Sequence, residues 1–273
     1  MNAPFYSLAV VCALCLNLSA RDKFLGAIWK SGWDSPSDAP AVFDSLFDQV
    51  TPENNGKWGV AEEERGQFRW KELDAMYDYA QQHNMLVKHH TFVWGSQQPS
   101  WITGISDDAE VRSAVEGWIR TYMDRFGSRV DMIDVVNEPL HQKPAYRGSL
   151  GGDGATGWDW VIWCFEKARE YAPHARLHIN DYDILKSDKN TKNYLKIITL
   201  LKQRGLIDGI GVQGHFLENT SVEKIRSNLN RLAESELPIH VSEYDVNVAD
   251  DRRQKQVYEE QLPVFWEQNA VVG

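Results

Sequence analysis

Two kinds of hydrophobic pattern alternate along the chain from about residue 24 onward. Short apolar runs, of the length of buried strands, are separated by longer segments whose apolar residues recur every three or four positions, as on one face of a helix. The predicted strands are 24–29, 49–51, 85–92, 130–136, 177–180, 210–213 and 238–243. The predicted helices include 71–83, 107–126, 159–171, 189–204, 222–232 and 250–268. Strict alternation of strand and helix predicts a parallel sheet covered by helices.

The order of elements fits either a doubly wound sheet or a barrel. A nucleotide-binding doubly wound sheet would carry a glycine-rich phosphate loop after a strand, and none of the predicted strands is followed by one. A barrel places its chemistry at the carboxyl ends of its strands. The sequence therefore favours the α/β class and a (β/α)8 TIM barrel.

The first 20 residues differ from the rest because they contain no charged side chain. The apolar run at 5–18 has the length of a signal-peptide core and is shorter than the roughly 20 residues that span a bilayer. No Lys or Arg precedes it, and Leu18 is a large residue for its place before a cleavage site. We expect residues 1–20 to be a cleaved export signal and the protein to be secreted, extracellular or periplasmic. A buried N-terminal strand is the alternative.

Composition excludes some classes of partner. The chain has 273 residues, 42% hydrophobic and 25% charged, which is ordinary for a soluble globular protein. A net charge of −10 argues against partners with an anionic surface, so we expect no nucleic acid and no membrane. Of the three cysteines only Cys164 lies beyond residue 20, so we expect no internal disulfide and a buried, apolar role for Cys164.

Polar residues directly follow six of the predicted strands. The segments are 51–58 (TPENNGKW), 89–97 (HHTFVWGSQ), 134–139 (DVVNEP), 180–182 (NDY), 213–215 (QGH) and 242–245 (SEYD). One such ending could be the N-cap of a helix, but six at equivalent places indicate a polar cleft over the mouth of a barrel.

Two glutamates in these segments suggest a reaction. Glu138 and Glu243 follow the fourth and seventh strands, which lie nearly opposite each other in a barrel. A pair of carboxyl groups can hydrolyse a glycosidic bond when one protonates the leaving oxygen and the other attacks the anomeric carbon. The acid needs a raised pKa, and the nucleophile needs hydrogen bonds that keep it ionised. His215 could donate one to Glu243, with Asp245 orienting the imidazole.

Taken together, the six motifs resemble those of glycoside hydrolase family 10, the retaining endo-β-1,4-xylanases. The resemblance runs from about residue 24 to residue 273 with the motifs in the family's order. This sequence departs from the family pattern at Phe92, Gly95, Ile133 and Tyr244. None of the four positions is that of a catalytic carboxylate.

The resemblance implies a role for each motif residue. Glu138 would be the acid/base and Glu243 the nucleophile in retaining cleavage of internal β-1,4-xylosidic bonds. The supporting residues would be Asn137, Gln213, His215 and Asp245. The substrate-binding residues would be Glu53, Asn54, Lys57, His90, Trp94, Gln97, Asn180 and Tyr182. Trp58 and Trp94 would be platforms for sugar rings. The partners would be xylan and xylo-oligosaccharides, and we expect a monomer with no metal and no cofactor.

The end of the chain departs most from the family. The family continues into an eighth strand, whose loop carries two tryptophans over the cleavage subsite, and into a final helix. Residues 269–273 would be only the first of that strand. We therefore expect 21–273 to be a catalytic domain incomplete at its C-terminus, with open edges on the first and seventh strands.

Three alternatives remain open at this point. The first is another retaining barrel glycosidase, such as an endoglucanase or a mannanase, and the second is a glycan-binding barrel without turnover. The third is a metal hydrolase using His89, His90, His215 and Asp245. Successive side chains of a strand point to opposite faces, which argues against a metal shared by His89 and His90.

Overall fold

The structure is a computed structural model that describes residues 23–273, so the expected export signal at 1–20 lies outside the described residues. Seven parallel strands form one sheet in sequence order. They are β1 (Gly26–Trp29), β2 (Gln49–Pro52), β3 (Leu86–Val93), β4 (Met132–Asn137), β5 (Arg176–Asp181), β6 (Gly209–Gln213) and β7 (Ile239–Ser242). The predicted parallel sheet is confirmed.

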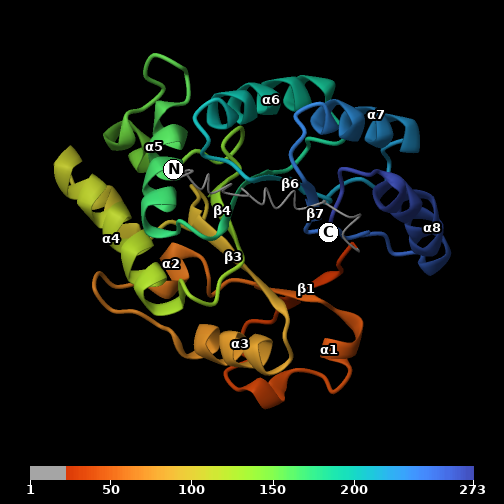
Figure 1. Cartoon of the computed structure of the whole chain (residues 1–273), viewed down its shortest axis with the longest axis horizontal. Coiled ribbons are helices and arrows are strands. Elements are labelled where there is room, and N and C mark those ends of the chain that lie inside the picture. Colours follow the sequence, from red (N-terminus) through yellow and green to blue (C-terminus); the bar gives the residue numbers. More distant parts are fainter. Residues whose placement is uncertain (1–22) are drawn as a thin grey trace, which may run out of the picture.

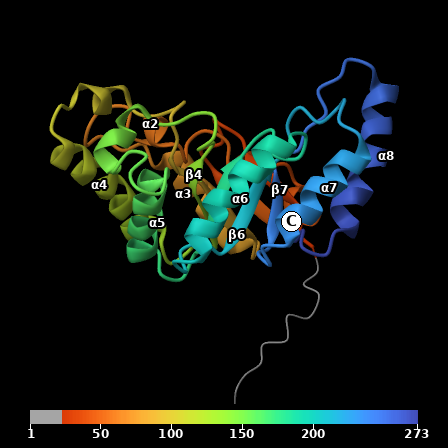
Figure 2. The same cartoon turned by 90° about the horizontal axis from the view of Figure 1, so that it is seen from above.

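Helices follow the strands and surround the sheet, which curls into an incomplete ring (Figure 1, and from a second direction Figure 2). They are α1 (Phe43–Leu46), α2 (Trp58–Ala61), α3 (Lys71–Gln82), α4 (Asp108–Phe126), α5 (Asp159–Tyr171), α6 (Asp188–Lys202), α7 (Val222–Ala233) and α8 (Asp251–Glu267). Short 3-10 turns occupy Pro36–Asp38, Ser100–Gly104 and Ala145–Leu150. The arrangement is that of a TIM barrel with seven strand–helix units, as the sequence predicts.

Local sequence explains where the longer helices begin and end. Four of them start after a polar residue whose side chain accepts a hydrogen bond from the first turn, namely Asp107, Ser187, Ser221 and Asp250. After α6 the chain reverses through Gly205 at φ +66°, a conformation that glycine adopts without a steric penalty. Within residues 23–273, none of the helices is long and apolar enough to cross a membrane.

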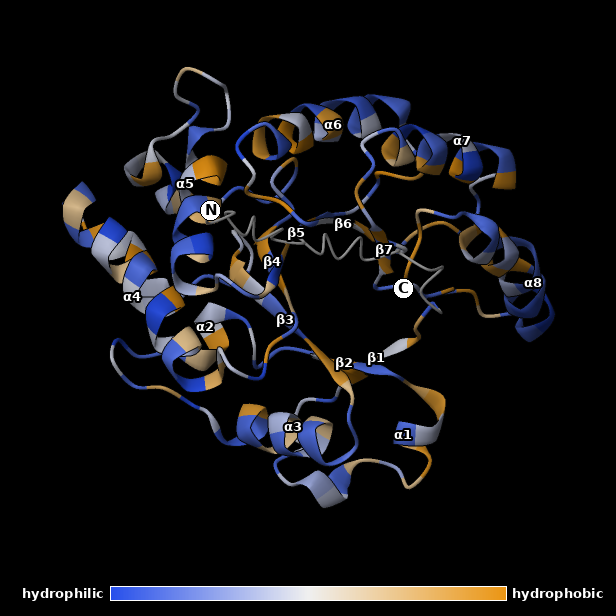
Figure 3. Ribbon diagram, in the orientation of Figure 1, coloured by the Kyte–Doolittle hydropathy of each residue, from blue (hydrophilic) through white to orange (hydrophobic). Residues whose placement is uncertain are grey.

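The hydrophobic core lies between the sheet and the helices. Each long helix combines hydrophobic and hydrophilic residues (Figure 3), as expected when one face is buried and the other meets solvent. Trp118 of α4, Trp160 of α5 and Tyr194 of α6 are no more than 1% exposed. Cys164 is free and fully buried, as predicted.

Polar side chains fill part of the inside of the curved sheet. Lys88 of β3 and Asp134 of β4 form a buried ion pair at 2.9 Å. His178 of β5 and His240 of β7 lie with their rings 4.3 Å apart, although their strands are not neighbours. The inside of the sheet, next to the carboxyl ends of the strands, therefore contains charged side chains.

The first and seventh strands do not pair with each other, and the expected gap between them is present. Residues 270–273 occupy the end of this gap where β1 and β7 begin. Val271 forms a parallel bridge with Ile239 of β7, and Val272 O accepts from Phe24 N, 3.1 Å away, just before β1. Beyond these contacts the edge of β1 remains open, and Leu25 and Ile28 are 53% and 52% exposed.

Candidate active site

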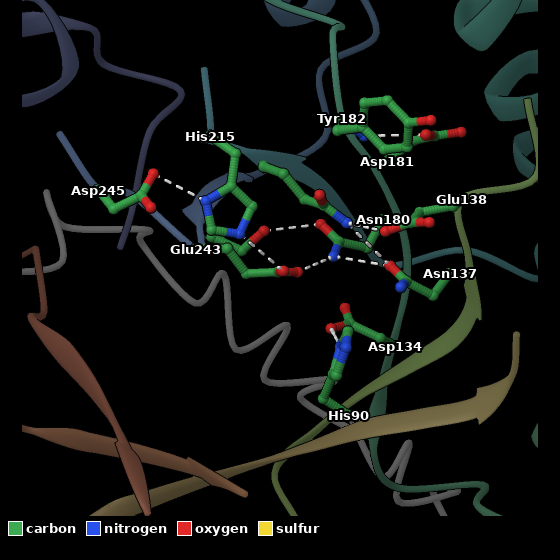
Figure 4. Close-up of polar contacts among 12 residues, drawn as sticks. His90, Asp134, Asn137, Glu138, Asn180, Asp181, Tyr182, His215, Glu243 and Asp245 are labelled. Atoms are coloured by element: carbon green, nitrogen blue, oxygen red, sulfur yellow. Dashed lines mark hydrogen bonds and ion pairs between the residues drawn. The ribbon is translucent and has the colours of Figure 1, made fainter. Parts of the chain in front are cut away.

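The carboxyl ends of β4 to β7 bring Glu138 and Glu243 into one hydrogen-bond network (Figure 4). Gln213 Nε2 donates to Glu138 Oε1 at 3.0 Å and to Asn137 Oδ1 at 3.3 Å. Asn180 Nδ2 donates to the same Asn137 oxygen at 3.0 Å and to Glu243 Oε1 at 2.7 Å. Three amide side chains thus connect the two carboxyl groups.

Both glutamates occupy an unusual backbone conformation directly after their strands. Glu138 has φ +56° and Glu243 has φ +53°, in the left-handed region that few non-glycine residues adopt. Glu138 N donates to Asn180 O at 2.7 Å, so the main chain stays bonded to the neighbouring strand through this turn. Tertiary contacts, not local propensity, hold the two residues in place.

Glu138 lies in a nearly closed environment. The residue is 7% exposed, and Trp94 Nε1 donates to its Oε2 at 2.8 Å. Burial is the largest influence and raises the pKa of Glu138 above its usual value. The hydrogen bonds from Gln213 and Trp94 oppose that rise without cancelling it. A carboxyl group in this state can keep its proton at higher pH than an ordinary glutamate.

Glu243 lies in a more open place, with 32% of its side chain exposed. Desolvation of its carboxylate raises the pKa, but the hydrogen bond from His215 and the positive charges at His90 and Lys88 outweigh it and leave the pKa lowered. His215 Nε2 lies 3.3 Å from Glu243 Oε2. Glu243 therefore favours the ionised form.

His215 is held between two carboxylates, the arrangement that the strand pattern predicts. Its Nδ1 lies 2.8 Å from Asp245 Oδ1, while Nε2 faces Glu243. The hydrogen bond to Glu243 raises the pKa of His215 to about 9, and the bond to Asp245 adds to the rise. A protonated imidazole next to Glu243 is thus the stable form near neutral pH.

Below Glu243 the buried carboxylate of Asp134 contacts two nitrogen-bearing side chains of β3. Asp134 Oδ2 lies 2.9 Å from both Lys88 Nζ and His90 Nδ1. Burial raises the pKa of Asp134, but the Lys88 charge and the His90 hydrogen bond lower it well below its usual value. Asp134 therefore stays charged, and it fixes His90 where its charge acts on Glu243.

Glu53, Asn54 and Lys57 lie together after β2, as their common motif predicts. Lys57 Nζ donates to Asn54 Oδ1 at 3.0 Å and lies 5.1 Å from the centre of the Trp94 ring. Burial lowers the pKa of Lys57, while the charges of Glu243, Glu53 and Glu138 oppose this effect. The Lys57 ammonium therefore faces the region shared by the two central carboxyl groups.

Tyr182 and Gln97 lie at the margin of this network. The Tyr182 ring stacks on His141 with the ring centres 4.0 Å apart, and His141 Nδ1 lies 2.6 Å from Asp181 Oδ1. Gln97 Oε1 is buried and has no hydrogen-bond partner among residues 23–273.

Three contributors to the site were missed by the sequence reasoning. Ser242 Oγ donates to Asn180 Oδ1 at 2.7 Å and so orients that amide toward Glu243. Lys88 neutralises Asp134, and His141 supports Tyr182. The available signals were a lysine within an apolar strand run and two polar residues in or next to motifs already recognised.

The prediction that Trp58 is a sugar platform is wrong. Trp58 is 2% exposed, and its Nε1 donates to Glu62 Oε2 at 2.6 Å. Its ring packs against Trp101 and Trp118, because the first turn of α2 points this residue toward the core. Trp94, in contrast, is partly exposed and contacts Glu138 directly.

The two adjacent histidines of β3 point to opposite sides, as predicted. The His89 ring lies 3.8 Å from that of Tyr122 on α4, whereas His90 binds Asp134. In the part of the chain that the structure describes, no group of three or more His, Cys, Asp or Glu is arranged to hold a metal ion.

Comparison with known proteins gives one consistent family. The model of glycosyl hydrolase family 10 matches residues 15–273. Endo-1,4-beta-xylanase B of Cellvibrio japonicus is 37% identical over 255 residues, which are 92% of this chain and 40% of that protein. Endo-1,4-beta-xylanase 2 of Claviceps purpurea is 31% identical over 245 residues, 85% of this chain and 74% of that protein. The chain thus spans well under half of the Cellvibrio protein.

Solved structures show the same architecture. The GH10 structure from Paenibacillus barcinonensis has a TM-score of 0.79 at 25% identity. The match covers 91% of this chain and 80% of the Paenibacillus chain. Native xylanase 10B from Thermotoga maritima has a TM-score of 0.78 at 26% identity, covering 92% of this chain and 81% of its own.

Proposed function

Because the chain belongs to glycosyl hydrolase family 10, we propose that it is an endo-1,4-β-xylanase that cleaves internal xylosidic bonds of xylan with retention. The observation that carries the proposal is the pair Glu138 and Glu243, whose pKa values are shifted in opposite directions within one network. Environments that push two carboxyl pKa values apart are what separate an acid from a nucleophile. We propose residues 21–273 as the catalytic domain and export through residues 1–20.

In the first step, ionised Glu243 attacks the anomeric carbon while Glu138 gives its proton to the leaving oxygen, so that a glycosyl ester forms and one chain departs. Asn180 and His215 each contact one oxygen of Glu243 and hold it for attack. Asn137 Oδ1 accepts from two amides, so its own NH2 group is left to donate to a sugar hydroxyl.

In the second step, Glu138 takes a proton from water as that water attacks the ester and regenerates Glu243. The charge of Glu243 is one of the causes that raise the pKa of Glu138. That charge disappears while the ester exists, so the pKa of Glu138 falls and the group becomes the base that the step needs.

Proton NMR of the products formed first from xylohexaose tests retention. We expect the new reducing end to appear as the β-anomer and to mutarotate later. An α-anomer formed first would contradict the proposal. Initial rates on xylan, glucan and mannan test the substrate, and a preference for glucan or mannan would assign a different glycosidase activity.

A Glu243→Ala variant tests the assigned nucleophile. We expect it to lose hydrolysis of an aryl xyloside and to recover part of it when azide is added, because a small anion can enter the space left by the carboxylate. Lys192→Ala, at an exposed position of α6, is a control for expression and folding. Equal activity of Glu243→Ala and the parent would show that another group attacks. Calorimetric binding of xylohexaose without any product would favour the glycan-binding alternative.

A further inference from the structure

A buried glutamine of α8 connects the two loops that carry Glu243 and His215. Gln261 is 2% exposed and lies on the buried face of its helix. Its Oε1 accepts a hydrogen bond from Tyr244 Oη at 3.0 Å, and its Nε2 donates to Leu217 O at 2.8 Å. An amide group inside a core costs stability unless its donor and acceptor are paired. Here one partner comes from the loop after β7 and the other from the loop after β6.

The two partners of this glutamine stand next to residues of the proposed active site. Tyr244 directly follows Glu243, and Leu217 comes two residues after His215. The two site residues meet where His215 Nε2 lies 3.3 Å from Glu243 Oε2. Because Gln261 bonds one residue of each loop, it restrains both of the main chains that determine this separation.

The Tyr244 side chain is packed tightly between α8 and the end of β6. Its ring meets those of Tyr258 and Phe265 edge-on, with the ring centres 5.4 and 5.1 Å apart. A Cβ added to Gly214 would lie 2.8 Å from Tyr244 Cα, Cβ and Cδ2, so the main chain after β6 touches Tyr244 directly. This packing leaves the hydroxyl group little freedom to turn away from Gln261.

Other residues of α8 hold only the outer parts of the same loops. Arg253 Nη2 donates to Glu218 O at 3.0 Å. Gln254 Nε2 donates to Val246 O at 2.9 Å. Both carbonyl groups belong to residues three positions beyond the site residue of their loop. Tyr244 is the residue directly after the proposed nucleophile, so its bond acts much closer to the reacting group.

We propose that Tyr244 and Gln261 are positioning residues, which hold Glu243 and His215 at the separation that nucleophilic attack requires. The assignment rests on the proposed xylanase function and deepens it. Both residues act through the main chain of the two loops, since Gln261 is buried and the Tyr244 ring packs against α8. Position 244 is one of the four at which the sequence departs from the family pattern, so the resemblance does not imply this role.

The first test is Tyr244→Phe in the full chain, which removes the hydrogen bond and keeps the ring. With xylohexaose we expect kcat to fall about tenfold and KM to stay within about twofold, because a displaced nucleophile slows the reaction while the cleft still binds. Tyr258→Phe is the matched control. It keeps the ring contact with Tyr244 and removes a hydroxyl group that makes no hydrogen bond within residues 23–273.

The pH profile separates positioning from a mere loss of stability. Of the four ionisable groups with the largest influence on Glu243, only His215 stands on a loop that Gln261 bonds. The others, from β3 and β4, are Lys88, His90 and Asp134. The hydrogen bond from His215 lowers the pKa of Glu243. Tyr244→Phe should loosen that bond, so the acid side of the kcat/KM profile should move to higher pH, whereas Tyr258→Phe should leave it in place.

A second variant, Gln261→Met, removes both hydrogen bonds at a similar side-chain volume. We expect the same changes as in Tyr244→Phe with a larger fall in kcat, since Leu217 is released as well. The double variant should be no slower than Gln261→Met, because the Tyr244 hydroxyl acts through Gln261. An additive loss in the double variant would show that the hydroxyl acts elsewhere and would overturn the proposal.

Urea unfolding of every variant completes the test. If Tyr244→Phe and Gln261→Met unfold more easily but keep the parental kcat and pH profile, the contact is purely structural and the positioning role fails alone. If the parent chain cleaves neither xylohexaose nor an aryl xyloside, the xylanase proposal fails and the positioning role fails with it.

Discussion

The two carboxyl groups follow strands that differ in how completely they are paired within the sheet. We call β3 to β6 the closed side, because each strand there has a neighbour on both edges, and β7 with β1 the open side. Every residue of β4 is buried, whereas β1 alternates between exposed and partly exposed residues until Trp29. Glu138 belongs to the closed side and is 7% exposed, while the side chain of Glu243 on the open side is 32% exposed.

The difference shows two ways of setting a carboxyl pKa. On the closed side burial raises the pKa of Glu138 against the hydrogen bonds it receives. On the open side the hydrogen bond from His215, together with the charges of His90 and Lys88, lowers the pKa of Glu243 although desolvation raises it. The pKa of the proposed acid therefore depends on packing, and the pKa of the proposed nucleophile depends on a few side chains that single substitutions can remove.

The largest expected effect is the loss of activity on replacing either glutamate, and its dependence on the leaving group should distinguish Glu138 from Glu243. Glu243→Ala should lower kcat/KM by about 10³-fold or more on both xylan and an aryl xyloside, because both need the nucleophile. Glu138→Ala should lower it by about 10²–10⁴-fold on xylan but far less for ester formation from an aryl xyloside with an acidic phenol, whose departure needs no proton. Burst kinetics on the two substrates would measure this. Equal losses for Glu138→Ala on both would remove the distinction between the two roles.

A matched pair of Ile→Ala substitutions compares the packing of the two sides. Ile179 of β5 is fully buried, and Ile28 of β1 is 52% exposed. Ile179→Ala should lower the free energy of unfolding by about 2–5 kcal/mol through a cavity in the core. Ile28→Ala should cost less than about 1 kcal/mol. Urea unfolding gives both values, and similar losses would mean that β1 is as well packed as β5.

The buried His178 inside the sheet predicts that the free energy of unfolding falls in acid. Burial lowers the pKa of His178 to about 3 from the ordinary 6.5. Unfolding therefore takes up a proton below pH 6.5, and stability present above that pH is lost as the pH falls toward 3. His178→Phe should remove the contribution of His178, about 2 kcal/mol at pH 5, while the buried His89 and His240, whose pKa values are also lowered, keep theirs. The exposed His174→Gln is the control, and an unchanged acid dependence in His178→Phe would contradict the assignment.

The smallest expected effects are shifts in the pH profile of kcat/KM. The proposed mechanism needs Glu243 ionised and Glu138 protonated, so the profile should be a bell whose acid side reports Glu243 and whose alkaline side reports Glu138. His215→Gln removes a cause that lowers the Glu243 pKa, so the acid side should move to higher pH. Trp94→Phe removes a donor that lowers the Glu138 pKa, so the alkaline side should move up. Each shift should be within about one pH unit. Movement of the same side in both variants would show that the two environments are not independent.

Much of the fold could be predicted because it follows from local patterns. The predicted helices 159–171 and 222–232 differ from α5 and α7 by at most one residue, since the period of their apolar residues marks both and Ser221 caps α7. The position of Glu138 and Glu243 at strand ends also followed from the sequence. The direction of Trp58 did not, because an aromatic residue in a motif fits the core as well as a sugar surface. Ser242 and Lys88 were missed because their partners, Asn180 and Asp134, come from other strands.

The left-handed backbone at Glu138 and Glu243 bears on how stability and activity are balanced in this fold. A side chain with a Cβ at φ +56° or +53° costs on the order of 1 kcal/mol relative to glycine. At these two positions the residue with the lowest backbone strain is glycine, which carries no carboxyl group. Glycine at either site should thus relieve the chain while removing the proposed chemistry. Selection for backbone stability alone would not favour a glutamate at either position.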